Sequence, residues 1–501
     1  MVNSRHFPAL RPSGDAFLLF VLLIARVRID TLAEWAAIPT SMLQRDVATL
    51  LDGIVSAHSL MLLSDRQTTD PVTLLLISVA FGLFLIYLVV DWLRACWSPT
   101  VIFRIKLVLV CLIVGILVFG QAGLFIALRH ISTPAAYAHD GGVIQTEVTI
   151  HYLLKGINPY VADYRSTPMA EWGTEYRTAL DHYPYLPWTF LFSTPFYLAS
   201  SITIGWFDQR FVYLLLFAIT LVFSSHLVRS AEGKLGLLIV LGLNPILASD
   251  VIFGQNDSFV LFWIVLGVWL LHRATAHHKG GRNPELWCSL SMVAFGLACA
   301  SKPTIWFLVP FLIVYRWRTF LPHPVHPVPR RITRILTNMR AVVQHLWPLA
   351  LTFIVITGPW FVWHPAAMIE DVWHWSAGTA ETSYQIRGWG FSNFILALGL
   401  VPSRLAYWPF WMIELVIAVP LLAVGMWRLW HNPRLTVALQ GYAILLLGFF
   451  YGSRFLNENY VGFLLAIFTI AFFMVDAGPS KPPPDDLHVV PRDASAETED
   501  G

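Results

Sequence analysis

The feature that most constrains this chain is the repetition of long apolar runs. One run, LVLVCLIVGILVFGQAGLFIAL, covers residues 107–128, and another covers 72–92. A helix needs about 20 mostly apolar residues to cross the hydrocarbon core of a bilayer. Charged residues make up 13% of the chain, whereas soluble domains carry roughly 25%. These observations exclude a soluble globule, a disordered protein and a fibrous protein.

The apolar runs indicate helices rather than a membrane barrel. Barrel strands alternate apolar and polar residues, and the run at 107–128 does not alternate. We therefore predict an all-α polytopic membrane protein with about 11 transmembrane helices, in a range of about 10 to 13. The predicted apolar segments cover 72–92, 106–127, 187–205, 212–228, 235–250, 256–272, 285–300, 303–315, 347–363, 406–428, 436–452 and 459–475.

The chain divides into three regions. Residues 1–71 form an N-terminal region that could include one span, and residues 72–475 form the multi-span domain, with a long external loop at 129–186. Residues 476–501 are rich in proline and then acidic, a composition typical of a disordered tail, which we expect in the cytoplasm. The net charge of +2 gives no reason to expect a nucleic-acid partner.

Lysine and arginine in short loops set the orientation of a membrane protein. The basic connections, which we expect to be cytoplasmic, are 93–106, 272–284, 316–345 and 428–435. The connections that we expect outside are the acidic loop 129–186 and the segments 251–256, 364–405 and 452–458.

The three segments between two of these outside connections raise a parity problem. Residues 187–205, 212–228 and 235–250 begin and end outside, which three spans cannot do. Arg229 and Lys234 favour a cytoplasmic turn between the second and third segments. Residues 187–205 are therefore our preferred non-spanning segment.

The first external loop carries the most reactive side chains. Asp140 can cap a helix that runs to about Lys155, and Gly156 suits the position after its end. Asp140, Glu147 and His151 are spaced by seven and four residues, which would place them on one helix face. A carboxylate there could act as a general base. A helix cap and a solvated surface pair are the structural alternatives.

Further polar clusters lie at the predicted outer ends of apolar segments. Asn244-Pro245 should break a helix shortly before the GQND turn at 254–257. Lys302 and Arg454 are candidates to bind a phosphate through charge-assisted hydrogen bonds. Glu414 differs, because it lies within an apolar run and could be a coupling-ion site. The candidate substrate-binding residues are His151, Gln255, Asn256, Asp257, Lys302, Arg387, Arg454 and Glu458.

An ordered series of motifs resembles the GT-C superfamily of membrane glycosyltransferases, with the closest likeness to the polyprenyl-phosphate-mannose-dependent mannosyltransferases. The likeness covers roughly residues 100–470. Its motifs are Asp140, LLKGINPY (153–160), YLP (185–187), GQNDS (254–258) preceded by Asn244-Pro245, and SKPT (301–304).

The resemblance implies a GT-C-like helical bundle that takes a sugar from a polyprenyl-phosphate donor. It implies inverting transfer to a lipid or glycan acceptor on the non-cytoplasmic face, and we expect a bacterial plasma membrane. It assigns the general-base position to Asp140 and the donor phosphate to Lys302 or Arg454. Asp140 stands farther from LLKG than the family pattern, so Glu147 is the alternative catalytic acid.

Other interpretations remain open at this stage. We expect no cofactor, although His139, Asp140 and His151 could hold a divalent metal. Asn244-Pro245 and Glu414 would also suit a lipid or solute transporter or flippase. A polysaccharide polymerase or ligase would use similar charges in external loops, and a non-catalytic membrane scaffold would explain the tryptophans.

Overall fold

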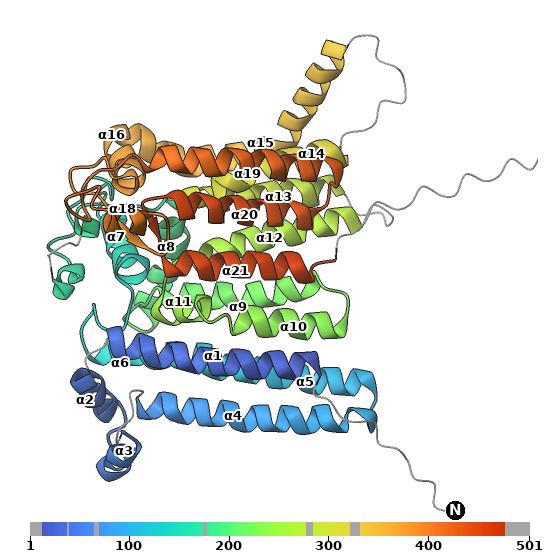
Figure 1. Cartoon of the computed structure of the whole chain (residues 1–501). Coiled ribbons are helices and arrows are strands. Elements are labelled where there is room, and N and C mark those ends of the chain that lie inside the picture. The colour runs from blue at the N-terminus through green and yellow to red at the C-terminus, as the bar shows by residue number, and fades with distance from the viewer. Residues whose placement is uncertain are drawn as a thin grey trace, which may run out of the picture.

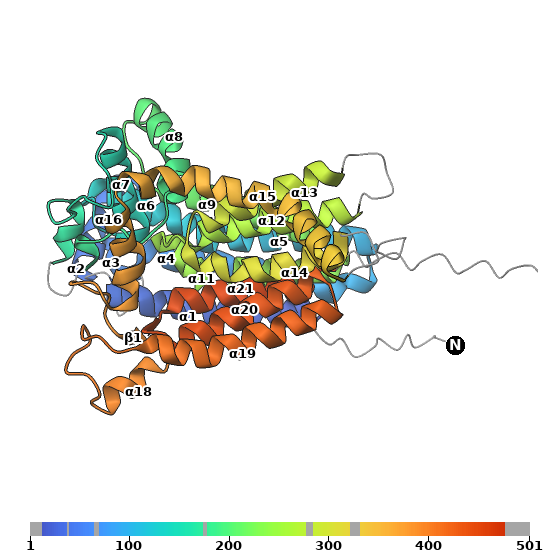
Figure 2. The same ribbon diagram turned by 90° about the horizontal axis from the view of Figure 1, so that it is seen from above.

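The computed structural model describes residues 13–37, 40–64, 70–173, 178–276, 284–320 and 331–475. Long helices lie side by side, and many short helices and loops gather at one end of them, which we call the loop end (Figure 1, left). The view from above shows the same arrangement (Figure 2). The predicted tail at 476–501 lies outside the described residues.

Helices dominate the described residues. The N-terminal elements are α1 (Gly14–Ala37), α2 (Thr40–Leu50), α3 (Ala57–Ser64), α4 (Pro71–Trp92), η1 (Leu93–Ala95), α5 (Pro99–Val114), η2 (Gly115–Gly120) and α6 (Gln121–Ile131). The next elements are η3 (Asp140–Ile144), α7 (Gln145–Leu154), η4 (Pro168–Trp172), η5 (Thr178–Leu180), α8 (Trp188–Thr203), α9 (Arg210–His226), α10 (Ala231–Gly242), α11 (Leu247–Phe253) and α12 (Asp257–Ala276).

The C-terminal half continues the bundle. Its helices are α13 (Pro284–Cys299), η6 (Pro303–Leu308), α14 (Val309–Phe320), α15 (Arg331–Trp363), α16 (Pro365–Ile369), η7 (Glu370–His374), α17 (Trp375–Ala377), α18 (Ser392–Ala397), α19 (Phe410–His431), α20 (Leu435–Gly452) and α21 (Glu458–Phe473). Two short strands, β1 (Arg387–Gly388) and β2 (Phe455–Leu456), pair in parallel, with Arg387 opposite Phe455 and Gly388 opposite Leu456.

Six helices of the described chain are long and apolar enough to cross a membrane, and α10 with α11 makes a seventh if the bent pair is one span. The prediction of a helical, multi-pass membrane protein is therefore confirmed. The count of about 11 spans stays a prediction, because α9, α13 and α21 are apolar but shorter. The six helical segments are Pro71–Ala95, Pro99–Ile131, Asp257–Thr275, Gln344–Trp363, Phe410–His431 and Leu435–Gly452.

The two ends of the bundle carry different connections. Helices α7, α16 and α18 lie at the loop end, whereas α4 joins α5 at the opposite end (Figures 1 and 2). The connection between α4 and α5, part of the predicted basic connection 93–106, therefore lies at the end opposite α7, α16 and α18, and the orientation in the membrane stays a prediction. Helix α8, from the segment we prefer as non-spanning, also lies at the loop end.

The break between α10 and α11 is fixed by Asn244. Its Oδ1 accepts hydrogen bonds from the backbone N–H groups of Ile246 and Leu247 at 3.2 and 3.1 Å, which caps the new helix. Its Nδ2 donates to the carbonyl of Gly462 in α21 at 2.9 Å. The two helices meet at an angle of 51°. The predicted helix break is confirmed, and it brings the turn after α11 to the loop end.

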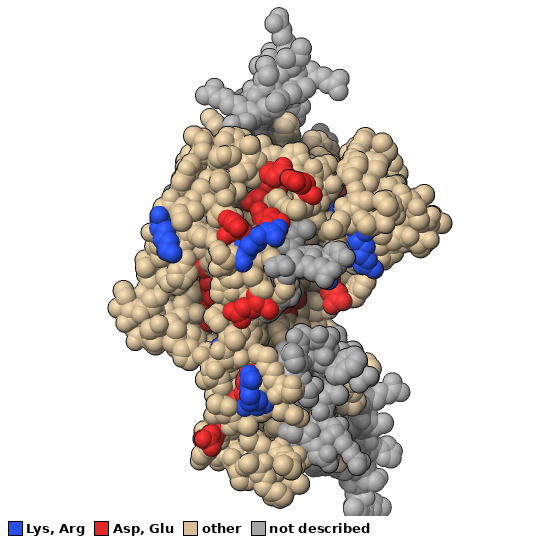
Figure 3. All heavy atoms as spheres, turned by 90° about the vertical axis from the view of Figure 1, so that its left-hand side faces the viewer, with Lys and Arg blue, Asp and Glu red and all other residues tan. Residues whose placement is uncertain are grey.

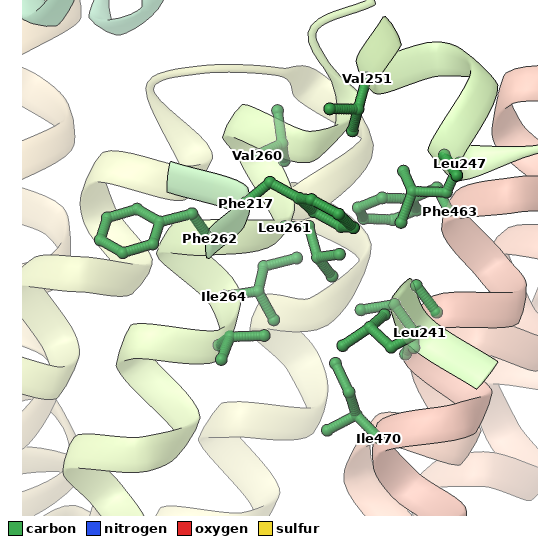
Figure 4. Close-up of a cluster of buried hydrophobic side chains, with 14 of the residues drawn as sticks. Phe217, Leu241, Leu247, Val251, Val260, Leu261, Phe262, Ile264, Phe463 and Ile470 are labelled. Atoms are coloured by element: carbon green, nitrogen blue, oxygen red, sulfur yellow. The ribbon is translucent and has the colours of Figure 1, made fainter. Parts of the chain in front are cut away.

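An apolar core holds this break in place. Figure 4 shows side chains from α9, α10, α11, α12 and α21 packed together. Phe217, Leu241 and Leu247 are fully buried there. In lipid, close packing is the main source of helix association, so this contact fixes the position of α11.

A buried ion cluster joins α1 to α4 and α5. The Nζ of Lys106 lies 2.8 Å from Asp15 Oδ2 and 2.6 Å from Asp91 Oδ1. It also donates to the hydroxyl of Ser13 at 3.1 Å. All three charged side chains are less than a tenth exposed. Because Lys106 is the nearest cation to both carboxylates, with Arg94 lying 3.8 Å from Asp91, it stabilises the packing of α1.

We predict that Lys106→Met destabilises the protein by about 3–5 kcal/mol, because it removes the nearest cation from two buried carboxylates and leaves Asp91 only the partly exposed Arg94 at 3.8 Å. Thermal unfolding of the detergent-purified protein measures the change. Lys155→Met is the matched control, since Lys155 is exposed and should change stability by less than about 0.5 kcal/mol. Equal melting temperatures for the two variants would contradict a stabilising role for the cluster.

Candidate functional site

The start of the first external helix packs against the turn after α11. The backbone N–H of His139 donates to the carbonyl of Phe253 at 2.7 Å. A Cβ added to Gly142 would lie 2.0 Å from the carbonyl oxygen of Gly254, so only glycine allows this contact. The backbone around Asp140 is therefore next to the GQND turn.

A second backbone contact brings in the lysine junction. The N–H of Leu186 donates to the carbonyl of Ser301 at 3.2 Å, and the N–H of Trp188 donates to the carbonyl of Ala300 at 3.1 Å. The YLP motif thus lies beside the segment between α13 and η6 that carries Lys302. Motifs that are more than a hundred residues apart in sequence meet at the loop end.

Lys302 lies in a buried polar cluster with Asn256, Asp257 and Asn459, which we call the lysine cluster. Its Nζ is 2.6 Å from Asp257 Oδ1 and donates to Asn256 Oδ1 at 3.3 Å. It also lies 5.0 Å from the ring centroid of Tyr460. The other oxygen of Asp257 accepts a hydrogen bond from Asn459 Nδ2 at 2.5 Å. Lys302 and Asp257 are 7% and 2% exposed, so the ammonium charge is already balanced inside the protein.

Arg454 has a different environment. It is 1% exposed, and its guanidinium donates to the backbone carbonyls of Tyr384, Ala406 and Arg404. No carboxylate of a described residue forms an ion pair with it, and burial lowers the pKa of Arg454 to about 10. An arginine has five N–H donors, so these carbonyls do not use all of its N–H groups. Its charge is therefore not balanced by any carboxylate of the described residues.

Two further arginines lie close to Arg454 in the fold. Arg387 in β1 pairs with Phe455, the residue after Arg454. The backbone N–H of Ile386 donates to the carbonyl of Arg404 at 2.7 Å. Arg387 and Arg404 are exposed. We call Arg387, Arg404 and Arg454 the arginine cluster.

The loop end exposes charges of both signs. Figure 3 shows this end face-on, with Asp and Glu side chains across its middle and Lys and Arg side chains beside them. The guanidinium of Arg387 interacts electrostatically with Tyr460, whose ring lies over Lys302. The arginine cluster and the lysine cluster are therefore neighbours.

Glu147 is held in an ion-pair network. Arg129 donates to its two oxygens at 2.9 and 2.7 Å, and the backbone N–H of Gln209 donates at 2.9 Å. Arg129 also binds Asp208 at 2.8 Å, and Arg210 binds both oxygens of Asp208. Burial raises the pKa of Glu147, against the opposing effect of Arg129. Both oxygens are thus occupied.

The helix that follows Asp140 begins and ends where the sequence predicts, but its first turn is a π-helix. The N–H of Ile144 bonds to the carbonyl of His139 five residues earlier, at 3.4 Å. Rotation per residue is smaller in such a turn, so the spacing of seven does not place Asp140 on the face that Glu147 and His151 share in the regular helix α7. His151 is exposed and contacts Tyr197, away from the partners of Glu147. The side chain of Asp140 lies outside the described part of the structure.

The sequence analysis did not identify a buried pair of a histidine and an aspartate. His182 Nδ1 lies 2.7 Å from Asp371 Oδ1, and His182 Nε2 lies 2.7 Å from Thr382 Oγ1. The other oxygen of Asp371 accepts from the backbone N–H of Tyr183 at 2.9 Å. Burial raises the pKa of Asp371, whereas these hydrogen bonds lower it. No sequence spacing reveals a pair 189 residues apart.

An apolar groove of about 590 Å³ opens beside the lysine junction. It lies among η6, α15, α16 and η7, and Trp306 is only four residues from Lys302. Leu186, whose N–H binds Ser301, is part of its wall. The residues that form the groove are Leu186, Trp306, Phe353, Ile354, Thr357, Gly358, Phe361, Met368, Ile369, Val372 and Trp373.

The remaining candidates lie at the same end of the bundle. Gln255 is half-buried in the turn before α12, and Glu458 is exposed at the start of α21. Among the described residues, no group of three or more His, Cys, Asp or Glu side chains could hold a metal ion.

Comparisons with protein-family models, with curated proteins and with solved structures found no match. The function is therefore argued from the residues and their contacts.

We predict that Asp208→Asn destabilises the protein by about 3–5 kcal/mol, because Arg129 and Arg210 lose their shared buried carboxylate. Burial alone would raise the pKa of Asp208, but the two arginines lower it well below 3.8. Its contribution is therefore complete above the ordinary pKa of an aspartate and is lost as the pH falls through the lowered pKa. Thermal unfolding at neutral pH measures the effect.

The control for this prediction is Asp181→Asn. Asp181 pairs with Arg165, which is 52% exposed, and such surface pairs contribute about 0–1 kcal/mol. If both variants lost equal stability, the network would not have the stabilising role assigned to it.

Proposed function

We propose that this protein is an integral membrane glycosyltransferase. It moves a sugar, mannose or a similar hexose or pentose, from a polyprenyl-phosphate donor to a lipid or glycan acceptor on the non-cytoplasmic face. The observation that carries the proposal is the meeting of three environments at the loop end. An apolar groove, an arginine cluster without a paired carboxylate and a buried polar cluster match the lipid, phosphate and sugar of such a donor.

The groove suits the lipid part of the donor. Its wall is almost entirely apolar, and it begins four residues from Lys302. An isoprenoid chain in the membrane would be held there by close packing against this wall, because the surrounding lipid is equally apolar. A donor anchored there keeps its tail in the membrane while its head group reaches the polar residues.

The phosphate is best assigned to the arginine cluster rather than to Lys302. Asp257 already balances Lys302 at 2.6 Å, so an anion there would meet a neutral pair. Arg454 has no such partner among the described residues, and Arg387 is exposed beside it. Arginine also presents parallel N–H groups that match phosphate oxygens.

The transfer needs a base, and we assign this role to Asp140. The carboxylate takes the proton from an acceptor hydroxyl as its oxygen attacks the anomeric carbon of the sugar. The bond from that carbon to the phosphate oxygen breaks, and the phosphate leaves with the electron pair. The arginine cluster stabilises the departing charge. A single displacement inverts the anomeric centre. Glu147 is the weaker candidate, because Arg129 occupies both of its oxygens.

A transporter is the second candidate, and one observation favours it. The bent pair of α10 and α11 resembles the discontinuous helices at transporter binding sites. Proteoliposomes given a radiolabelled polyprenyl-phosphate sugar separate the two. A transferase forms a new labelled product, whether on a lipid or on a growing polysaccharide, whereas a transporter moves the donor unchanged.

We predict that Asp140→Asn lowers sugar transfer by about 10²-fold or more, the range typical for loss of a general base. Glu147→Gln should keep transfer per folded molecule while it lowers the melting temperature. Incorporation of label from the donor measures transfer, and membrane extraction checks insertion. An active Asp140→Asn with an inactive Glu147→Gln would move the base to Glu147. Activity in both would refute an acid–base role for either residue.

We predict that Arg387→Gln weakens inhibition by free polyprenyl phosphate, the product, by about tenfold, as expected for one charge-assisted hydrogen bond. Competition assays give the inhibition constant. Arg165→Gln is the control, because Arg165 is also an exposed arginine of the loop end but pairs with Asp181. An unchanged inhibition constant in Arg387→Gln would show that Arg387 does not bind the phosphate.

A further inference from the structure

Asp250 is a buried carboxyl group without a hydrogen-bond partner for one of its oxygens. It lies in α11, one turn before the GQND turn, and is 7% exposed. Its Oδ2 is buried and accepts no hydrogen bond from any described residue. Leaving a buried polar group unpaired costs about 1–3 kcal/mol, and more for a charge. The described residues therefore leave this acceptor open to a further partner.

The charged groups around Asp250 do not remove this cost. The carboxyl interacts electrostatically with Asp257, Lys302, Glu458 and Arg26, so it belongs to the lysine cluster. Two of these neighbours are acidic, the lysine is already 2.6 Å from Asp257, and the guanidinium of Arg26 donates to Gln121 at 3.4 Å.

The backbone holds Asp250 in a fixed place. Its carbonyl accepts hydrogen bonds from the N–H groups of Gly254 and Gln255 at 2.8 and 2.7 Å, which close the end of α11. Gly254 has a φ of +87°, the left-handed conformation that this closure uses. A fixed carboxyl can bind a ligand without first losing conformational entropy.

Asn256 supplies the complementary group. Its Oδ1 accepts from Lys302 at 3.3 Å, but its Nδ2 is buried and has no hydrogen-bond partner among the described residues. An unpaired acceptor on Asp250 and an unpaired donor on Asn256 thus flank the same lysine. A phosphate has only acceptor oxygens at its charged edge, so it would leave Asp250 unsatisfied. A hydroxyl group both donates and accepts.

We infer that Asp250 and Asn256 form a subsite for the hydroxyl groups of the donor sugar. Asp250 accepts hydrogen bonds from the sugar, and Asn256 donates one to it. The inference rests on the proposed function and deepens it, because it assigns the sugar to this cluster and the phosphate to the arginines. The Lys302–Asp257 pair then positions Asn256. A site built to bind a hydroxyl discriminates strongly against a sugar that lacks it.

The test measures binding of polyprenyl-phosphate mannose and its monodeoxy analogues to the detergent-purified full chain. At least one deoxy analogue should bind the wild type about tenfold or more weakly than the parent donor. Asp250→Ala should bind the parent donor about tenfold more weakly and should no longer distinguish it from that analogue. Asp181→Ala is the matched control, and should bind and discriminate as the wild type does.

The possible outcomes separate this inference from the proposed function. If the wild type binds the parent donor but binds every deoxy analogue equally well, the hydroxyl subsite is refuted and the transferase proposal stands. If Asp250→Ala discriminates as the wild type does, Asp250 has no part in the subsite. If the wild type does not bind the donor at all, both proposals fail. If Asp250→Ala does not fold, Asp250→Asn replaces it. The binding of the deoxy analogues to the wild type then still tests the hydroxyl subsite.

Discussion

The buried side chain of Arg210 is the constraint on which the loop end depends. It is fully buried, and it donates to the carbonyls of Tyr137 at 2.7 Å and Ile252 at 3.2 Å while it binds Asp208. One guanidinium thereby joins the first external loop to α11. A Cβ on Gly254 would lie 2.8 Å from the Arg210 side chain, so the glycine of the GQND turn makes room for it. Together with the hydrogen bond from His139 to Phe253, this contact fixes the backbone around Asp140 relative to α11.

The sequence predicted those features that depend on local chemistry. Asn244-Pro245 ended one helix and began another, and Gly156, with a φ of +72°, followed the end of α7. Asp257 and Glu458 opened helices at the expected outer junctions. These features follow from capping and backbone conformation within a few residues. The polar clusters at the ends of apolar segments lie together at one end of the bundle, where backbone hydrogen bonds join residues 139 and 253 and residues 186 and 301.

The partners of the charged residues could not be predicted in the same way. Glu147 belonged to a proposed face with Asp140 and His151, yet it binds Arg129, which lies on another helix. Spacing describes neighbours on one helix only, and the π-turn at the start of this helix changes even that relation. His182 and Asp371 gave no signal at all, because their contact depends on how two distant loops pack. The groove beside η6 likewise requires the positions of four separate elements.

Counting charges also gave an incomplete account of the anion site. Lys302 and Arg454 looked equivalent in sequence, since each is a cation at the outer end of an apolar segment. Burial makes them different, because a charge in a low-dielectric surrounding is defined by its partner. Lys302 has Asp257, whereas Arg454 has only backbone carbonyls. A neutral polar pair suits hydroxyl groups, and an unbalanced guanidinium suits a phosphate.

Separate environments for the sugar and the phosphate would allow the proposed transferase to act without a soluble nucleotide-binding domain. A polyprenyl-phosphate donor carries its own membrane anchor and a leaving group that arginine can stabilise. The protein then needs only to hold three parts of one molecule in a row along the membrane surface. The helix break at Asn244 and the junction at Lys302 place polar residues at the loop end of the bundle. Because each part of the donor has its own environment, altering the hydroxyl subsite should change which sugar binds and leave phosphate recognition intact.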